Sequence, residues 1–116
     1  MITLEDFKKV ELVVGKILAA EKIPETDKLL KLSVDLNEEK PRTIVSGISL
    51  YFPDCSVLVG KKCLFVANLE PRIIRGIESN GMILAVSTPD ATATAGQGKF
   101  SLLETNSVIQ AGTRAK

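Results

Sequence analysis

Two arginines, Arg72 and Arg75, stand close together in the stretch LEPRIIRGIESNGM, between Pro71 and Gly76. The proline fixes its own φ angle and biases the preceding residue toward extended backbone, and the glycine permits a tight turn. The arginines are therefore displayed at a low cost in conformational entropy. Because a planar guanidinium group forms paired hydrogen bonds with phosphate oxygens and stacks on unpaired bases, this arrangement suits contact with a folded RNA.

Residue types alone favour a simpler role for this turn. In that interpretation the two arginines only keep a hairpin soluble, while Ile73 and Ile74 pack inward. Polar side chains near such turns commonly satisfy backbone groups. Five further residues have equally simple roles, as turn formers, core or solvated charges: Asn68, Ser79, Met82, Lys31 and Arg42.

Catalytic chemistry has little support in this sequence. Histidine is absent, which removes the usual general base and the commonest zinc ligand. Ser46 lacks the GxSxG context of a nucleophile, and Glu38 and Glu39 would point apart on a strand. The GQGK motif before Phe100 lacks the first glycine and the final Ser or Thr of a phosphate loop. We therefore expect no enzyme, no cofactor and no metal, and an OB-fold hydrolase is the least supported function.

Cys55 and Cys63 are too far apart for a CxxC metal or redox pair, and both stand next to apolar residues. We expect buried free thiols rather than a disulfide. No apolar run approaches the ~18 residues of a membrane span, and the N-terminus is acidic and amphipathic, unlike a signal peptide. These features predict a soluble, cytoplasmic protein with no membrane association.

The size and composition fit a single globular domain over residues 1–116, with 45% hydrophobic and 25% charged residues. The net charge is only +1, but it is unevenly distributed. Residues 1–58 hold eight Lys/Arg against ten Asp/Glu, and residues 59–116 hold seven against four. Since nucleic-acid binders often carry a stronger basic excess, any RNA surface must be a local patch.

Alternating apolar and polar residues predict short strands separated by turns. The clearest alternation runs through Leu30, Leu32, Val34 and Leu36, whose side chains would share one face. Gly15 interrupts the first strand and predicts a bend there. The predicted strands cover residues 10–23, 29–36, 42–48, 63–69 and 82–87. A short helix or long loop is predicted for residues 48–62, a loop for residues 88–98, and short closing segments after it.

Five strands with short turns and no alternating helices predict an all-β, OB-fold-like barrel of Greek-key type rather than a parallel α/β sheet. Periodicity does not fix the strand order. An SH3-like barrel or a small sandwich would show much the same pattern.

Longer stretches carry a resemblance to a known family. They are DFKKVELVVGKILAAEKIPETDKLLKLSVDL, RTIVSGI, LVGKKCLFVANLEPRIIRGIESNGMILA and the closing GKFSLLE and AGTRAK. With the signature NLxPRxxRGxxSxGM, the sequence resembles the tRNA-binding domain family. That family includes a free-standing structure-specific tRNA-binding protein, the C-terminal appendix of many bacterial methionyl-tRNA synthetases, and a domain near the end of the endothelial monocyte-activating cytokine precursor.

The resemblance implies a five-stranded OB-fold with a short helix and terminal extensions, which binds the L-shaped tRNA body and forms homodimers. Ile73 stands where many relatives place another basic residue, which lowers the local charge. The positions that match the RNA-facing residues of the family are Lys31, Arg42, Asn68, Arg72, Arg75, Ser79 and Met82.

The sequence supports two functions, one from the resemblance and one from the near-neutral charge and the possible exposed strands at the termini. The leading one is a non-catalytic, homodimeric tRNA-binding module, free-standing or attached to methionyl-tRNA synthetase. The alternative is an assembly module that dimerises or docks onto an aminoacyl-tRNA synthetase, with incidental RNA contact. Val108 and Ile109 are candidates for the subunit contact, unless they close the core of their own barrel.

Overall fold

The protein is built around an antiparallel five-stranded sheet in a computed structural model that describes residues 1–88 and 99–116. The strand order is β3-β2-β1-β4-β7. The strands are β1 (Leu12–Lys22), β2 (Leu30–Asp35), β3 (Arg42–Ser46), β4 (Lys62–Val66) and β7 (Met82–Ile83). The edge strands β3 and β7 contact each other, so the sheet curls into a nearly closed barrel. This arrangement confirms the predicted OB-fold barrel.

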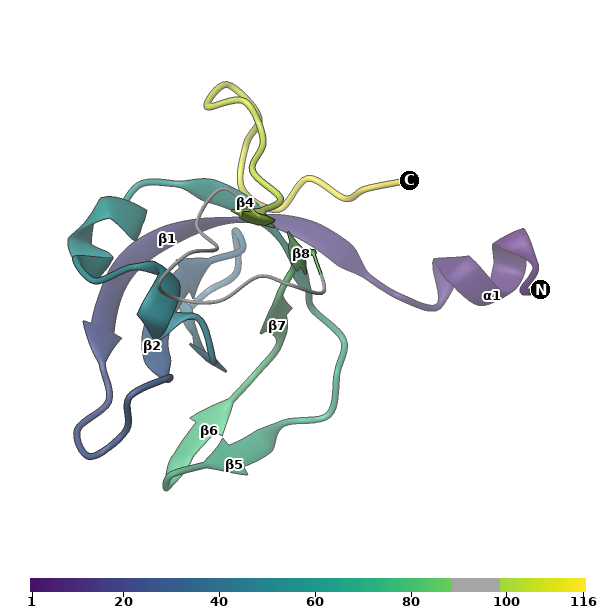
Figure 1. The fold of residues 1–116 in the computed structure, drawn as a ribbon. Coiled ribbons are helices and arrows are strands. Elements are labelled where there is room, and N and C mark those ends of the chain that lie inside the picture. Colours follow the sequence, from purple (N-terminus) through teal and green to yellow (C-terminus); the bar gives the residue numbers. More distant parts are fainter. Residues whose placement is uncertain (89–98) are drawn as a thin grey trace.

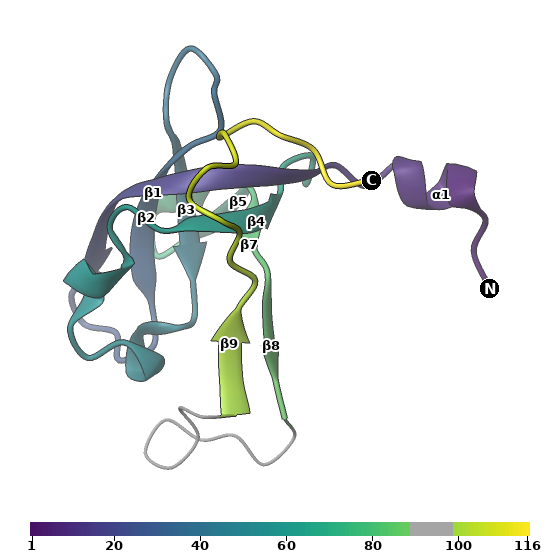
Figure 2. The same cartoon turned by 90° about the horizontal axis from the view of Figure 1, so that it is seen from above.

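Within the described residues, two small ribbons and three short helical elements accompany the five-stranded sheet (Figure 1). The first ribbon pairs β5 (Arg72–Ile74) with β6 (Ile77–Ser79), and the second pairs β8 (Ala85–Ser87) with β9 (Phe100–Leu102). The helix α1 (Leu4–Lys8) projects from the barrel, and the chain's C-terminus lies near the connection between α1 and β1 (Figure 2). The 3₁₀ helices η1 (Ser49–Tyr51) and η2 (Cys55–Leu58) occupy the segment predicted as a short helix or loop.

The barrel core follows the alternation predicted for β2. Leu30, Leu32, Val34 and Leu36 are all buried, because alternate side chains of a strand point to the same face. Apolar side chains from the other parts of the chain complete this core: Val13, Ile17, Ile44, Ile48, Leu58, Cys63, Phe65, Ile83 and Leu102.

The strand β1 differs in detail from its prediction. Val10 lies outside the strand and is exposed, while Val13 and Val14 are both buried. The C-terminal segment covers the β1 edge, since the Val14 amide donates to the Thr113 carbonyl at 2.8 Å. The ladder irregularity lies between Ile17 and Ala19 rather than at the predicted glycine. Val13 belongs to the barrel core, whereas Val14 is buried outside it, where the C-terminal segment runs beside the strand.

The predicted fifth strand is divided in two. β7 pairs with β4 in the barrel, whereas β8 leaves the barrel to pair with β9. Between them, the Leu84 amide still donates to the Leu64 carbonyl at 3.0 Å. Apart from Thr88, the loop predicted for residues 88–98 lies outside the described residues, as does most of the GQGK motif.

Both cysteines are free thiols, as predicted. Cys63 is buried in the core, and burial together with the nearby Glu104 raises its pKa to about 11. Cys55 is only half-buried, so the prediction of a buried thiol holds fully for Cys63 alone. Within the described part of the chain, no helix is long and apolar enough to cross a membrane.

Candidate nucleic-acid interface

The arginines of the sequence motif lie on a tight β-hairpin, which we call the arginine hairpin (residues 72–79). Arg72 pairs with Ser79, Ile73 with Glu78, and Ile74 with Ile77. Arg75 and Gly76 form the turn, with φ angles of +52° and +78°. Two consecutive positive φ angles are typical of the type I′ turn, whose twist matches that of the flanking strands. The turn predicted at Gly76 is therefore present, and Arg75 stands at its tip.

Both hairpin arginines are exposed. Neither arginine side chain makes a hydrogen bond or ion pair with any residue that the structure describes. Ile73 is also 71% exposed, whereas Ile74 and Ile77 are half-buried on the opposite face of the ribbon. The simpler interpretation, in which both isoleucines pack inward, thus fails for Ile73.

The returning strand of the hairpin is fastened to β3. Ser79 is buried, and its Oγ accepts a hydrogen bond of 2.9 Å from the Val45 amide. The Asn80 amide donates to the Thr43 carbonyl, also at 2.9 Å. Because the Ser79 hydroxyl already has an internal partner, the structure places this candidate RNA residue beneath the hairpin rather than on its surface.

Asn68 fastens the chain just before the hairpin. Its Oδ1 accepts from the Glu11 amide at 2.9 Å, and its Nδ2 donates to the Lys9 carbonyl at 2.6 Å. The neighbouring Ala67 amide donates to the Glu11 carbonyl at 2.8 Å. The Asn68 side chain thus joins the end of β4 to the segment between α1 and β1.

Arg42 is half-buried at the start of β3, not on a fully solvated face. Its Nε and Nη2 donate to the two Glu38 carboxylate oxygens at 2.7 and 2.8 Å. Its Nη1 donates to the carbonyl oxygens of Ala67 and Asn80. The hydrogen bond with Glu38 raises the pKa of Arg42, and the same bond lowers the pKa of Glu38. The guanidinium group is therefore largely occupied by internal acceptors.

The last two candidates reach solvent. Lys31 on β2 forms an ion pair of 3.3 Å with Glu21, its cross-strand neighbour on β1. Met82 on β7 is 46% exposed, although its residue type suggested a core position. OB-folds commonly bind oligonucleotides on their second and third strands and on the connections that flank them. In this chain those parts include β2, β3 and the segment that carries the arginine hairpin.

Comparison with known proteins identifies the family of this chain. A family model described as "Putative tRNA binding domain" matches residues 12–114. The chain belongs to the tRNA-binding domain family.

The similar proteins include a much longer enzyme and chains of about the same length as this one. Methionine–tRNA ligase from Methanocella arvoryzae is 54% identical over 92 residues, which cover 78% of this chain and 13% of that relative. The chain thus spans a small part of the length of the curated relatives it matches. The crystal structure of a MetRS-related protein from Pyrococcus horikoshii superimposes with a TM-score of 0.86 at 38% identity, covering 100% of this chain and 98% of that one. The chaperone CsaA from Bacillus anthracis superimposes with a TM-score of 0.80 at 25% identity, covering 100% and 99% of the two chains.

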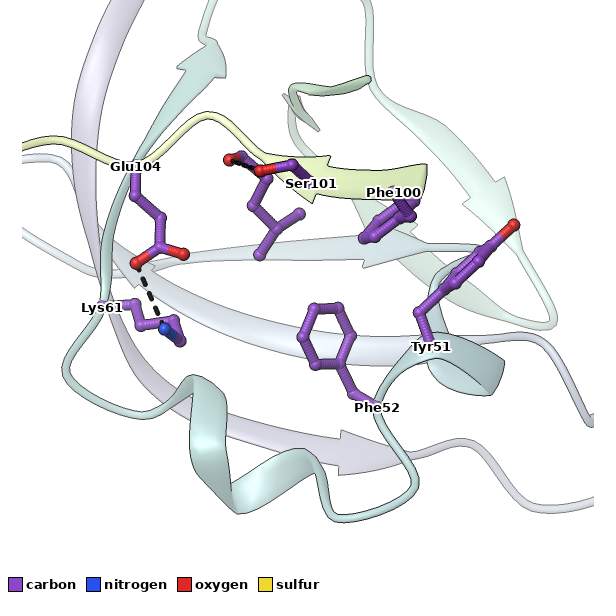
Figure 3. A pocket seen from close by; sticks show the side chains of 7 residues that line it. Tyr51, Phe52, Lys61, Phe100, Ser101 and Glu104 are labelled. Carbon is purple, nitrogen blue, oxygen red and sulfur yellow. Dashed lines mark hydrogen bonds and ion pairs between the residues drawn. The ribbon is translucent and has the colours of Figure 1, made fainter. Parts of the chain in front are cut away.

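An aromatic cluster at another side of this tRNA-binding domain was not foreseen from the sequence (Figure 3). The rings of Tyr51 and Phe100 stack with centroids 4.0 Å apart, and the ring of Phe52 meets Phe100 edge-on at 6.0 Å. They line a pocket of about 280 Å³, which also contains the ion pair between Lys61 and Glu104 at 3.1 Å. The stacked rings join η1 to β9, so they help to attach the second ribbon to the barrel.

The pairing of Glu38 with Arg42 was also not predicted from the sequence. The only sequence signal was its position four residues before Arg42, across the predicted NEEKP turn. Opposite charges on the two sides of a turn are common, so the residue types did not distinguish this pair from two solvated charges. The fold brings them together because β3 begins directly after the turn.

Proposed function

We propose that this chain is a non-catalytic module that binds tRNA through the arginine hairpin. The observation that carries the proposal is the exposure of Arg72 and Arg75 without an internal partner among the described residues. In the same structure the guanidinium of Arg42 is occupied by internal acceptors. Free, planar donors on a rigid turn lose little entropy when they bind phosphate oxygens.

The proposed RNA site contains all seven residues predicted from the sequence, in two roles. Arg72, Arg75, Lys31 and Met82 would touch the RNA, since each reaches solvent. A solvent-exposed ion pair contributes little, so a phosphate group can replace Glu21 beside Lys31. Arg42, Asn68 and Ser79 would support the hairpin through their internal hydrogen bonds.

The proposal includes a homodimer, and the surface around α1 supports it. Thr3 caps this helix through a reciprocal capping box with Asp6, yet none of its five residues is buried. Leu4 is 67% exposed and lines a groove of about 370 Å³ with Phe7 and Val10 against the C-terminal residues. A helix this short is not stable in isolation, so we propose that a second copy of the chain covers its apolar side.

Dimerisation would compensate for the low net charge. Each phosphate that a protein neutralises contributes about −0.7 to −0.9 to the slope of log affinity against log salt concentration. One hairpin supplies few such contacts. Two hairpins on a single RNA raise the effective concentration of the second contact, so modest patches can give useful affinity.

The same module can act free-standing or as part of a synthetase. The MetRS-related chain from Pyrococcus horikoshii is matched over 98% of its length, whereas the ligase from Methanocella arvoryzae is matched over only 13%. We propose the same binding role in either arrangement, with aminoacyl-tRNA synthetase as a partner and the cytoplasm as the location.

An assembly module is the second candidate, favoured by the apolar groove at α1 and by the net charge of +1. In that function the chain dimerises or docks onto a synthetase, and RNA contact is incidental. Light scattering combined with a gel shift separates the two functions. A dimer that does not bind tRNA at low salt would favour the assembly function.

The direct test is the double variant Arg72→Ala with Arg75→Ala, compared with wild type for binding to several tRNAs. We expect weaker binding to all of them, unchanged folding, and a salt slope flatter by about 1.5 per chain engaged. The matched control is Lys16→Ala with Lys22→Ala, which removes the same charge from β1, two strands away from β3. Equal affinity losses in the two double variants would remove the hairpin from the proposed site.

A further inference from the structure

The chain segment that carries the arginine hairpin leaves the barrel and returns to it at two neighbouring points. It leaves after Ala67, at the end of β4, and returns through Asn80, just before β7. The Nη1 atom of Arg42 donates to the carbonyl oxygens of both residues, with a distance of 3.3 Å to Asn80. One guanidinium group therefore joins the two ends of the segment.

Glu38 holds that guanidinium group from the other side. The carboxylate accepts from Nε and Nη2 at 2.7 and 2.8 Å, in the paired geometry that carboxylates share with phosphates. Glu11 is a further negative charge that acts on Arg42. With four hydrogen bonds to fixed acceptors, the planar group has little freedom to turn outward.

We propose that Arg42 is a positioning residue for RNA binding: with Glu38, it sets the direction in which the arginine hairpin projects, and the RNA contacts the hairpin instead of Arg42. This inference rests on the proposed tRNA-binding function. We call Arg42 and its acceptors Glu38, Ala67 and Asn80 the hairpin clamp.

The hairpin needs such a clamp because it is too small to be stable by itself. Each of its strands has three residues, and an isolated two-stranded ribbon is at best marginally stable in water. Ser79 and Asn80 attach only the returning strand to β3. On the departing side, Arg42 and Asn68 hold the chain. Without the clamp, RNA binding would have to order the hairpin, and that ordering reduces affinity.

A competing role for Arg42 makes the opposite prediction about Glu38. If an RNA phosphate displaced Glu38 and bound Arg42 directly, the Glu38 carboxylate would be a competitor of the RNA. Its removal would then free the guanidinium group and strengthen binding. In the clamp, removal of Glu38 lets Arg42 drift from the two carbonyl oxygens and weakens binding, although the protein becomes more positive.

The experiment compares Glu38→Ala with Glu39→Ala in the full chain, using unfractionated tRNA as the probe. Both variants lose one negative charge from the same turn, but Glu39 makes no ion pair within the described residues. We expect Glu38→Ala to bind about fivefold more weakly than wild type, and Glu39→Ala to bind equally or more tightly. Binding by Glu38→Ala that equals or exceeds that of Glu39→Ala would overturn the inference.

A double-mutant cycle tests whether Arg42 acts through the hairpin. Arg42→Gln is introduced into wild type and into the Arg72→Ala, Arg75→Ala variant, and tRNA affinity is measured for all four proteins. We expect Arg42→Gln to weaken binding in the wild-type background and to cause no further loss when the hairpin arginines are absent. An equal loss in both backgrounds would mean that Arg42 contacts the RNA itself.

Amide hydrogen exchange, measured without RNA, separates failure of the clamp from failure of the proposed function. In Glu38→Ala, exchange at Asn80 should speed up relative to exchange in the β1–β2 pairing, because the hairpin base opens locally. Unchanged exchange at Asn80 would overturn the clamp even if tRNA binds. If wild type fails to bind tRNA, the proposed function fails, whatever the exchange pattern.

Discussion

Gly15 lies on β1 at a point where the barrel interior leaves no room for a side chain. A Cβ atom built there would lie 2.6 Å from Val34 Cγ1 and 2.7 Å from Phe65 Cδ1. Contacts this short require the two core side chains to move, and both are fully buried. The sequence showed a glycine that interrupts a strand, but it did not show the close approach of β2 and β4 that requires it.

We expect Gly15→Ala to lower the free energy of unfolding by about 1–3 kcal/mol, the usual range for overpacking a core. Urea unfolding measures this change. The control is Gly47→Ala, because a Cβ atom at Gly47 would meet no atom within 4 Å. That substitution should change stability by less than about 0.5 kcal/mol. A similar effect of the two substitutions would contradict the packing described for Gly15.

Residues whose roles depend on local pattern were predictable, and those that depend on distant partners were not. Leu30 and Leu32 were assigned to the core because alternation alone fixes their face. The partners of Asn68 lie 57 and 59 residues away in the sequence, so no local pattern could show that its amide group is occupied. Residue type alone favoured a core position for Met82, because its side chain is apolar, but the residue is 46% exposed.

At the scale of elements, the arginine hairpin and the turn between β2 and β3 are linked through Glu38 and Arg42. The hydrogen bond from Arg42 lowers the pKa of Glu38 from its ordinary value of 4.5. A carboxylate with a lowered pKa in the folded state stabilises the fold above its unfolded value, and that contribution is lost as pH falls through the folded pKa. The link between these elements should therefore weaken in acid.

We expect Glu38→Ala to be less stable than wild type at pH 7, by up to about 1 kcal/mol, since the pair is partly solvent-exposed. The difference should begin to shrink as the pH falls below 4.5, the ordinary pKa of the carboxyl group, and should vanish below the lowered pKa of Glu38 in the folded state. Urea unfolding of both proteins across this pH range tests the link. A stability difference that does not shrink as the pH falls below 4.5 would show that the Glu38 charge does not stabilise the hairpin base.

At the scale of the whole molecule, the barrel displays two separate features, the arginine hairpin and the helix α1 (Figure 1). The hairpin attaches to β3, while α1 and the C-terminal residues lie beyond the start of β1. In the proposed dimer, this separation would leave the arginines exposed while a second copy covers α1. Val108 does not close the barrel core, since it is 81% exposed, so its role in a subunit contact stays a prediction.

The dimer proposal predicts that Leu4→Ser with Phe7→Ser raises the dissociation constant of the dimer by at least about a hundredfold, because each buried apolar side chain contributes ~1.5 kcal/mol or more and both copies carry the substitutions. Sedimentation or light scattering across a concentration series measures the shift. Val57→Ser with Val59→Ser removes two exposed apolar side chains elsewhere and should leave the dimer intact. If the two double variants self-associate equally, α1 is not part of the interface.

We propose that exposed arginines on a rigid hairpin recognise the folded shape of tRNA. The most direct test of this proposal is a binding panel of tRNA, a single RNA hairpin and a linear RNA duplex, matched in phosphate number and measured across salt concentrations with the oligomeric state monitored in parallel. We predict that tRNA binds most tightly at every salt concentration and that its advantage is lost in the Arg72→Ala, Arg75→Ala variant. Equal affinity for all three RNAs, or a tRNA advantage that survives in this variant, would contradict the account.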